Sequence, residues 1–188
     1  MTKKIMVVIM AMMMTLCMAG CDKEKQAGSS DASSSASVAS SSSASPAAKE
    51  ELTKLVVYYP DVNATGLKAV TKSVKVTGDD KYRAAVEALL AGTEDKLLTT
   101  IFPAKAKLLE VTVKGDLAVV NFDKHLTKGF NGGSTGEEML VGSLVNTLTE
   151  FKEIKRVQLQ VEGQDIDSIS GHLDLSKPVT RMPELIVK

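Results

Sequence analysis

The chain of 188 residues is poor in the side chains that most enzyme and metal sites use. It contains two cysteines, two histidines and no tryptophan, and aromatic residues make up 4% of it. Both cysteines, Cys17 and Cys21, lie in or just after an apolar N-terminal segment, so the region that follows holds no thiol. That region can therefore form no disulfide, no thiolate metal site and no cysteine nucleophile.

An excess of charge of either sign is also lacking. The whole chain has 23 basic and 23 acidic residues. If the first 20 residues are removed, Lys3 and Lys4 leave with them, and 23 − 2 = 21 basic residues face 23 acidic ones, a net charge of −2. Such a chain has no overall basic field for DNA or RNA, which argues against nucleic-acid binding.

The N-terminal segment has the layout of a bacterial secretion signal. Two lysines precede an apolar run at 5–18 that a single threonine interrupts. This run is too short for a permanent membrane-spanning helix, which needs roughly 20 residues. The small residues Ala19 and Gly20 then precede Cys21. We therefore interpret residues 1–20 as a signal peptide that takes no part in the fold.

The four residues Met18-Ala19-Gly20-Cys21 resemble the lipobox of bacterial lipoproteins, with Met18 in place of the usual leucine. The resemblance implies cleavage between Gly20 and Cys21. It also implies a diacylglycerol on the sulfur of Cys21, whose acyl chains, such as palmitate, anchor the protein to the cell membrane on its extracytoplasmic side. The alternative is an ordinary thiol near a signal peptide that is cut elsewhere.

Residues 21–50 have the composition of a disordered tether. Eleven serines stand among the seventeen residues at 29–45, and most of the others are alanine. Such a segment buries too little apolar surface to offset the entropy of ordering its backbone. A flexible chain of about 29 residues has a typical reach of about 30 Å. We therefore expect a domain that hangs from its lipid anchor on a flexible linker.

A single domain is predicted at 51–188, where strand and helix patterns begin. Runs rich in β-branched and aromatic residues predict strands at 52–59, 70–76, 108–113, 117–122, 157–161 and 185–187. Apolar residues at helical spacing predict one helix that begins at Asp79 and ends near Gly92, and a second at 134–151. Ser134 and Glu137 have the spacing of a capping box at the start of the second helix.

The order of these elements predicts an α+β fold, an α/β sandwich in which two helices pack on one face of a small sheet of three or four strands. Alternation of apolar residues at 157–161 indicates that the other face is wet. Tyr58 and Tyr59 are neighbours in a strand and so point to opposite faces. We expect one ring in the core and the other on the wet face, where it can anchor a partner.

A glycine-rich loop before the second helix is another candidate binding surface. It contains Asn131, Gly132, Gly133 and Ser134. Backbone amides at the start of a helix can hold an anion. The loop lacks both the Walker lysine and the Gly-x-Gly-x-x-Gly pattern. A flexible entry to the helix is therefore the alternative interpretation.

The titratable side chains form no recognisable catalytic or metal-binding pattern. The two histidines, His125 and His172, have no metal-ligand spacing, and Asp165 and Asp167 lack the frame of a calcium loop. We predict no catalytic residue, no cofactor and no metal. A hydrolase that uses Asp123, His125 or Asp165 stays as an alternative.

Five short blocks resemble, in order, the GerMN domain of sporulation and spore-germination proteins. They are Leu-Leu-Ala-Gly at 89–92, Phe-Pro at 102–103, Val-Val-Asn-Phe-Asp at 119–123, Leu-Val-Asn-Thr-Leu-Thr-Glu-Phe at 144–151 and Val-Gln-Leu-Gln-Val-Glu-Gly at 157–163. The resemblance implies one copy of a non-catalytic, lipoprotein-borne module, similar in fold to the ring-building motifs of secretion systems. It implies binding to other envelope proteins in sporulation, germination or envelope assembly. Binding of cell-wall glycan (peptidoglycan) or a small ligand, and self-association, stay open as alternatives.

Overall fold

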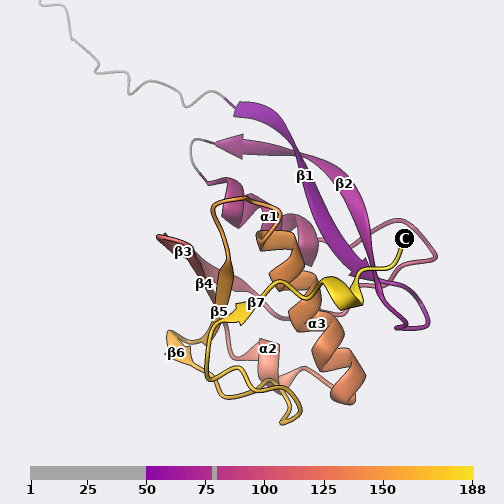
Figure 1. Ribbon diagram of the computed structural model, residues 1–188, viewed down its shortest axis with the longest axis vertical. Coiled ribbons are helices and arrows are strands. Elements are labelled where there is room, and N and C mark those ends of the chain that lie inside the picture. The colour runs from indigo at the N-terminus through magenta and orange to yellow at the C-terminus, as the bar shows by residue number, and fades with distance from the viewer. Residues whose placement is uncertain (1–49, 78–79) are drawn as a thin grey trace, which may run out of the picture. The chain divides into compact units, whose positions relative to one another are not determined.

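The computed structural model describes residues 50–77 and 80–188 (Figure 1). The predicted signal peptide, Cys21 and the predicted tether up to residue 49 lie outside the described residues, as does Asp79, the predicted start of the first helix. Strands and helices both occur in the described part, which confirms the predicted α+β class.

A long antiparallel hairpin opens the described part. Its strands are β1 (Glu50–Pro60) and β2 (Leu67–Thr77), and every residue of β1 pairs with one of β2. The strand predicted at 52–59 is confirmed. The strand predicted at 70–76 is present but longer, because pairing with β1 continues over all eleven residues. The hairpin forms a two-stranded sheet of its own.

A second sheet contains the other five strands of the described residues. They are β3 (Leu108–Lys114), β4 (Leu117–Phe122), β5 (Arg156–Val161), β6 (Gln164–Asp165) and β7 (Val179–Thr180). The predicted hairpin of β3 and β4 is confirmed, and β4 runs parallel to β5. The short strands β6 and β7 pair antiparallel with the two ends of β5.

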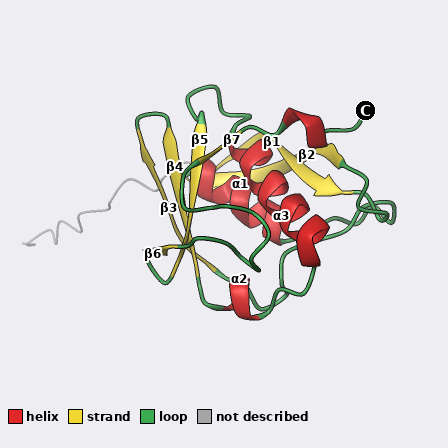
Figure 2. Ribbon diagram, turned by 60° about the horizontal axis from the view of Figure 1, so that its bottom comes forward, coloured by secondary structure: helices red, strands yellow, loops and turns green. Residues whose placement is uncertain are grey.

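Two helices lie between the hairpin and the second sheet (Figure 2). They are α1 (Lys81–Leu90) and α3 (Gly133–Leu148); both contact β1, while α1 also contacts β3 and α3 contacts β5. Twelve of the sixteen residues of α3 are buried, as expected of a helix covered on both sides. The sheet arrangement thus differs from the prediction. The first two strands form a separate layer across the helices instead of extending one sheet.

The C-terminal segment crosses α3 and reaches the hairpin. The strand predicted at 185–187 is wrong, because Pro183–Leu185 forms the short 3-10 helix η1, which proline at its first position favours. Ile186 then makes one parallel bridge to Leu67, and the Val187 N–H donates to the Leu67 carbonyl over 3.0 Å. Gly142 permits this crossing, since a Cβ there would lie 2.5 Å from Leu185 Cδ1.

Candidate functional site

Tyr58 and Tyr59, the first sequence-predicted contact residues, are both buried. Their exposed fractions are 5% and 1%. The expectation that one ring lies on a wet face is therefore wrong. Its physical cause is the extra layer: at this point β1 contacts both helices, so that Tyr58 packs with Met139 of α3 and Tyr59 reaches Ala88 of α1.

Each tyrosine hydroxyl has partners inside the protein. The Tyr59 hydroxyl donates to the carbonyls of Ala88 and Gly92 at the end of α1, at 2.7 and 2.8 Å, and burial raises the pKa of Tyr59 to about 12. The Tyr58 hydroxyl donates to Glu150 Oε1 and accepts from Arg181 Nη2, at 2.7 and 2.9 Å. Burial, followed by the hydrogen bond to Glu150, raises the pKa of Tyr58. These interactions give both side chains a structural role.

The predicted glycine-rich loop is exposed and does not contain the predicted capping box. Residues 131–135 are all exposed, and α3 begins at Gly133 with Gly132 as its N-cap and no side-chain cap. Ser134 therefore lies inside the helix. A Cβ at Gly132 would lie 2.6 Å from Phe130 Cζ, so the glycine lets the Phe130 ring fold back over the helix start.

Glu137, the predicted capping partner, is instead fully buried and binds the loop that follows β6. Its carboxylate accepts hydrogen bonds from the hydroxyls of Ser168 and Ser170 and from the backbone N–H groups of Ile169 and His172, over 2.6–3.1 Å. Burial raises the pKa of Glu137, but the donors, Ser170 and Ser168 foremost, outweigh it and lower the pKa to about 2. Glu137 is thus an ionised anchor for this loop, and the exposed His172 is held through its backbone alone.

The structure brings Asp123 and His125 together at the start of α2 (His125–Lys128), a helix that was not predicted. The Asp123 carboxylate lies 2.7 Å from His125 Nδ1 and also accepts from the Lys107 and His125 N–H groups. Burial raises the pKa of Asp123, but hydrogen bonds, that of the His125 ring foremost, hold it below its usual range. Asp165, the other residue of the hydrolase alternative, lies in β6 and accepts from Gln160.

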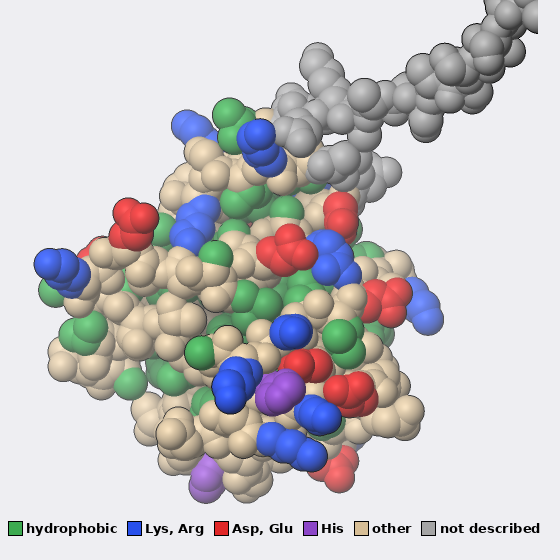
Figure 3. Space-filling view, turned by 180° about the vertical axis from the view of Figure 1, so that it is seen from behind, with side chains coloured by type: hydrophobic (Ala, Val, Ile, Leu, Met, Phe, Trp, Pro, Cys, Tyr) green, Lys and Arg blue, Asp and Glu red, His purple; other side chains and the backbone are tan. Residues whose placement is uncertain are grey.

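His125 borders a surface hollow of about 300 Å³, here called the histidine hollow. Its lining is Pro103, Ala104, Lys105, His125, Lys128 and Gly129. Seen from behind, one of the two histidines lies among several basic side chains, with acidic side chains also beside it (Figure 3). The sequence gives no sign that the two lysines meet, because they are 23 residues apart and only the fold brings the loop after Phe102 against α2.

A second hollow, of about 390 Å³, lies at the turn of the hairpin. It is lined by Asp61, Val62, Asn63, Thr65, Lys68, Leu97, Val187 and Lys188, here called the tip patch. Val62 and Leu97 are 54% and 69% exposed, and the Val62 N–H donates to the Leu97 carbonyl over 3.1 Å. An apolar residue in each of two polar loops is the only sequence signal for this patch, since the loops are more than 30 residues apart.

The turn beneath the tip patch is well ordered by Asp61. Its carboxylate accepts from the Asn63 and Thr65 N–H groups and from the Thr65 hydroxyl, at 2.5–3.3 Å. The hydrogen bond from the Thr65 hydroxyl is the main cause that lowers the pKa of Asp61. On the other side, the Thr99 N–H donates to the Pro60 carbonyl over 2.9 Å. The two loops that carry Val62 and Leu97 are thus held together by backbone hydrogen bonds.

A family model named Germane, described as "Sporulation and spore germination", matches residues 56–167, more than half of the chain. The chain belongs to this family. The predicted resemblance is thereby confirmed, and we refer to the described domain as a GerMN domain. The family description names no enzyme activity. A search of the curated proteins finds no match.

Solved structures agree with this assignment. A candidate lipoprotein from Clostridium perfringens is 27% identical, with a TM-score of 0.50 over 72% of this chain and 93% of that one. The tandem GerMN domains of the sporulation protein GerM from Bacillus subtilis are 23% identical, with a TM-score of 0.56 over 72% of this chain and 48% of that one. The first GerMN domain of GerM alone gives 20% identity and a TM-score of 0.55, over 69% and 98%. The similarity to the two GerM structures shows that this chain has the same fold as they do. The chain covers 48% of the structure with tandem GerMN domains.

The described residues of the GerMN domain contain neither a helix able to cross a membrane nor a group of three side chains suited to a metal ion. Two surface features of the described residues are candidates for a functional site: the Asp123–His125 pair with its lysines, and the tip patch. The first is a basic hollow and the second an apolar surface with polar edges. Both are suited to binding.

Proposed function

We propose that this chain is a membrane-anchored lipoprotein whose GerMN domain binds another protein of the cell envelope without catalysing a reaction. The lipobox-like residues before Cys21 and the serine-rich segment after it support the anchor. Similarity to a candidate lipoprotein over 93% of that chain supports it further. Membership of the sporulation and spore-germination family supports a role in sporulation, germination or envelope assembly.

The tip patch is the observation that carries the binding role. Val62 and Leu97 are two of the four large apolar residues that stand out as exposed in the described part; Leu52 and Leu109 are the others. Only Val62 and Leu97 border the same hollow. Adjacent apolar side chains on the surface typically mark a contact with another protein.

The patch is also suited to binding at low entropic cost. The loops that carry Val62 and Leu97 are joined by a backbone hydrogen bond, so little conformational freedom is lost when a partner covers them. Lys68 and Lys188 line the same hollow and are exposed, so they supply a charged rim. An apolar centre with a polar rim is the usual anatomy of a protein–protein interface.

The position of the patch fits a tethered domain. The chain from Cys21 enters β1 at Glu50, and the patch begins at Asp61, directly after the other end of β1. Eleven strand residues place these two ends about 33 Å apart. The predicted tether therefore joins the domain at the end of β1 that lies away from the patch.

Site-specific crosslinking in the host cell tests this proposal. A photoreactive amino acid at position 97 should yield a defined crosslinked protein, and the same probe at position 52 should not. Leu52 is the matched control because it is 71% exposed but lies near the start of β1. Val62→Asp should remove the product formed from position 97. A product that survives Val62→Asp, or equal products from both positions, would exclude the tip patch as the interface.

A further inference from the structure

We infer that the histidine hollow binds a phosphate group. This site is separate from the tip patch, shares no lining residue with it, and stands whether or not the patch binds a protein. The hollow combines three nitrogen-bearing side chains, Lys105, His125 and Lys128, in one space of about 300 Å³. Among residues 50–77 and 80–188, no carboxylate lines that space.

The two walls of the hollow are held close together. Gly129 ends α2, and a Cβ there would lie 3.1 Å from Pro103 Cβ, so the loop with Lys105 packs directly on the helix end. The loop is closed by a turn in which the Ala106 N–H donates to the Pro103 carbonyl over 2.9 Å. This packing holds the loop that carries Lys105 beside the helix that carries Lys128.

Asp123 sets the direction of the histidine ring. Its Oδ2 lies 2.7 Å from His125 Nδ1, while its Oδ1 accepts the N–H groups of Lys107 and His125. With Nδ1 engaged, the ring has Nε2 left for a ligand, and 40% of the side chain is exposed. A carboxylate behind a histidine orients the ring, and an Nε2 that carries a proton can donate to an anion. Asp123 is therefore a positioning residue for this site.

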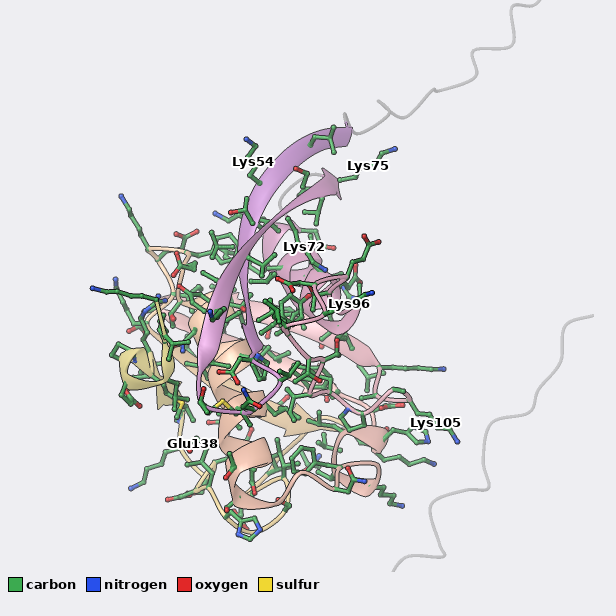
Figure 4. The ribbon with its side chains drawn as sticks, turned by 90° about the vertical axis from the view of Figure 1, so that its right-hand side faces the viewer. Lys54, Lys72, Lys75, Lys96, Lys105 and Glu138 are labelled. Carbon is green, nitrogen blue, oxygen red and sulfur yellow. The ribbon has the colours of Figure 1, made fainter. Side chains whose placement is uncertain are left out.

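The two lysines are available for an anion. Within the part of the chain that the structure describes, neither Lys105 nor Lys128 forms a side-chain hydrogen bond or an ion pair, and both are exposed. Lys81 shows the contrast, because its ammonium group binds Glu153 at 2.5 Å. Lys105 points away from the body of the domain (Figure 4). Unpaired ammonium groups beside an imidazole form a local positive site in a chain of no net charge.

Phosphate fits this arrangement better than a carboxylate does. Two ammonium groups and an imidazole N–H can donate to separate oxygens, and a phosphate monoester offers three strong acceptor oxygens and nearly two negative charges. A carboxylate offers two oxygens and one charge. The phosphate can come from a lipid headgroup or from a soluble compound, and the same three side chains would hold either.

Titration of the full mature chain with inorganic phosphate tests the inference. Millimolar phosphate should shift the backbone amide signals of Lys105, His125 and Gly129, and the His125 ring nitrogen signals, in a saturable way. The double variant Lys105→Gln, Lys128→Gln should bind at least tenfold more weakly. The matched control, Lys54→Gln with Lys96→Gln, removes the same charge from exposed lysines elsewhere (Figure 4) and should bind as the wild type does.

Equal affinity in the two double variants, or shifts that do not saturate, would overturn the inference. Thermal unfolding of each variant shows whether it is folded, and His125→Gln supplies an independent test, since it should also weaken binding. Vesicles that contain phosphatidic acid, whose headgroup is a phosphate monoester, and vesicles of phosphatidylcholine alone then separate the sources. Preference for the phosphatidic acid vesicles that the Lys105→Gln, Lys128→Gln variant loses assigns the phosphate to a lipid. Saturable phosphate binding without vesicle binding assigns it to a soluble compound.

Discussion

The side chain of Asn146, in the middle of α3, forms two reciprocal hydrogen bonds with the backbone of Met182. Asn146 Nδ2 donates to the Met182 carbonyl, and the Met182 N–H donates to Asn146 Oδ1, both over 2.9 Å. Arg181 adds a third link, because its Nη1 donates to the Asn146 carbonyl over 3.1 Å. Asn146 is fully buried. This pair therefore fixes the C-terminal segment across the helix.

Asn146→Ala should weaken this attachment strongly. The change leaves the N–H and the carbonyl of residue 182 without their partner, at a cost of about 2–4 kcal/mol in the free energy of unfolding. Urea denaturation measures the loss. Asn131→Ala is the matched control, since Asn131 is exposed in the loop before α3 and should change stability by less than about 0.5 kcal/mol. Equal effects of the two substitutions would contradict the structural role of Asn146.

Glu137→Gln should also destabilise the domain and should remove a pH dependence. The Glu137 pKa falls from 4.5 to about 2 on folding, so its ionised form contributes stability above pH 4.5 that is lost as the pH falls towards 2. That shift corresponds to about 3 kcal/mol. A glutamine amide cannot accept from all four donors, so the variant should lose about 2–4 kcal/mol at pH 7.

Unfolding at pH 7 and at pH 3 tests this prediction. The difference between the two pH values should be smaller in Glu137→Gln than in the wild type. Glu138→Gln is the control, because Glu138 is the exposed neighbour on the same helix (Figure 4). An unchanged pH dependence in Glu137→Gln would show that this carboxylate is not the anchor of the loop at 168–172.

The sequence predicts those elements whose patterns are local. The strands at 108–113, 117–122 and 157–161 and the two helices follow from alternation and helical spacing, and the structure has them. The separate hairpin layer could not be predicted, because alternation at 70–76 does not say which strand lies beside it. The tyrosine pair shows the consequence: one of Tyr58 and Tyr59 was expected on a wet face, but both are buried, and Tyr58 is part of a hydrogen-bond network with Glu150 and Arg181.

Tyr59 and Lys72 should be energetically coupled. Both donate to the carbonyls of Ala88 and Gly92 at the end of α1. Either donor can satisfy these carbonyls when the other is removed, so Tyr59→Phe and Lys72→Met should each cost about 1–2 kcal/mol. The double variant should cost at least about 0.5 kcal/mol more than their sum. A double-mutant cycle from urea denaturation measures this coupling, and simple additivity would contradict it.

The candidate sites were less predictable than the fold. Asp123 and His125 are close in sequence, so their pairing could be suspected from spacing alone. The lysines of the histidine hollow and the apolar pair of the tip patch come from loops far apart in the chain. The Ser134–Glu137 spacing fitted a capping box, but the side chain of Glu137 satisfies a distant loop instead. Local spacing cannot show whether the Glu137 side chain binds the start of its own helix or a distant loop.

Metabolic labelling with an alkyne fatty acid tests the lipid anchor most directly. The wild-type chain should take up the label and fractionate with membranes. Cys21→Ser should take up none and appear in the soluble fraction, because Cys21 carries the proposed acyl chains. The domain should remain folded in both, since it contains no cysteine. Labelling of Cys21→Ser equal to that of the wild type would contradict a lipoprotein anchored through this residue.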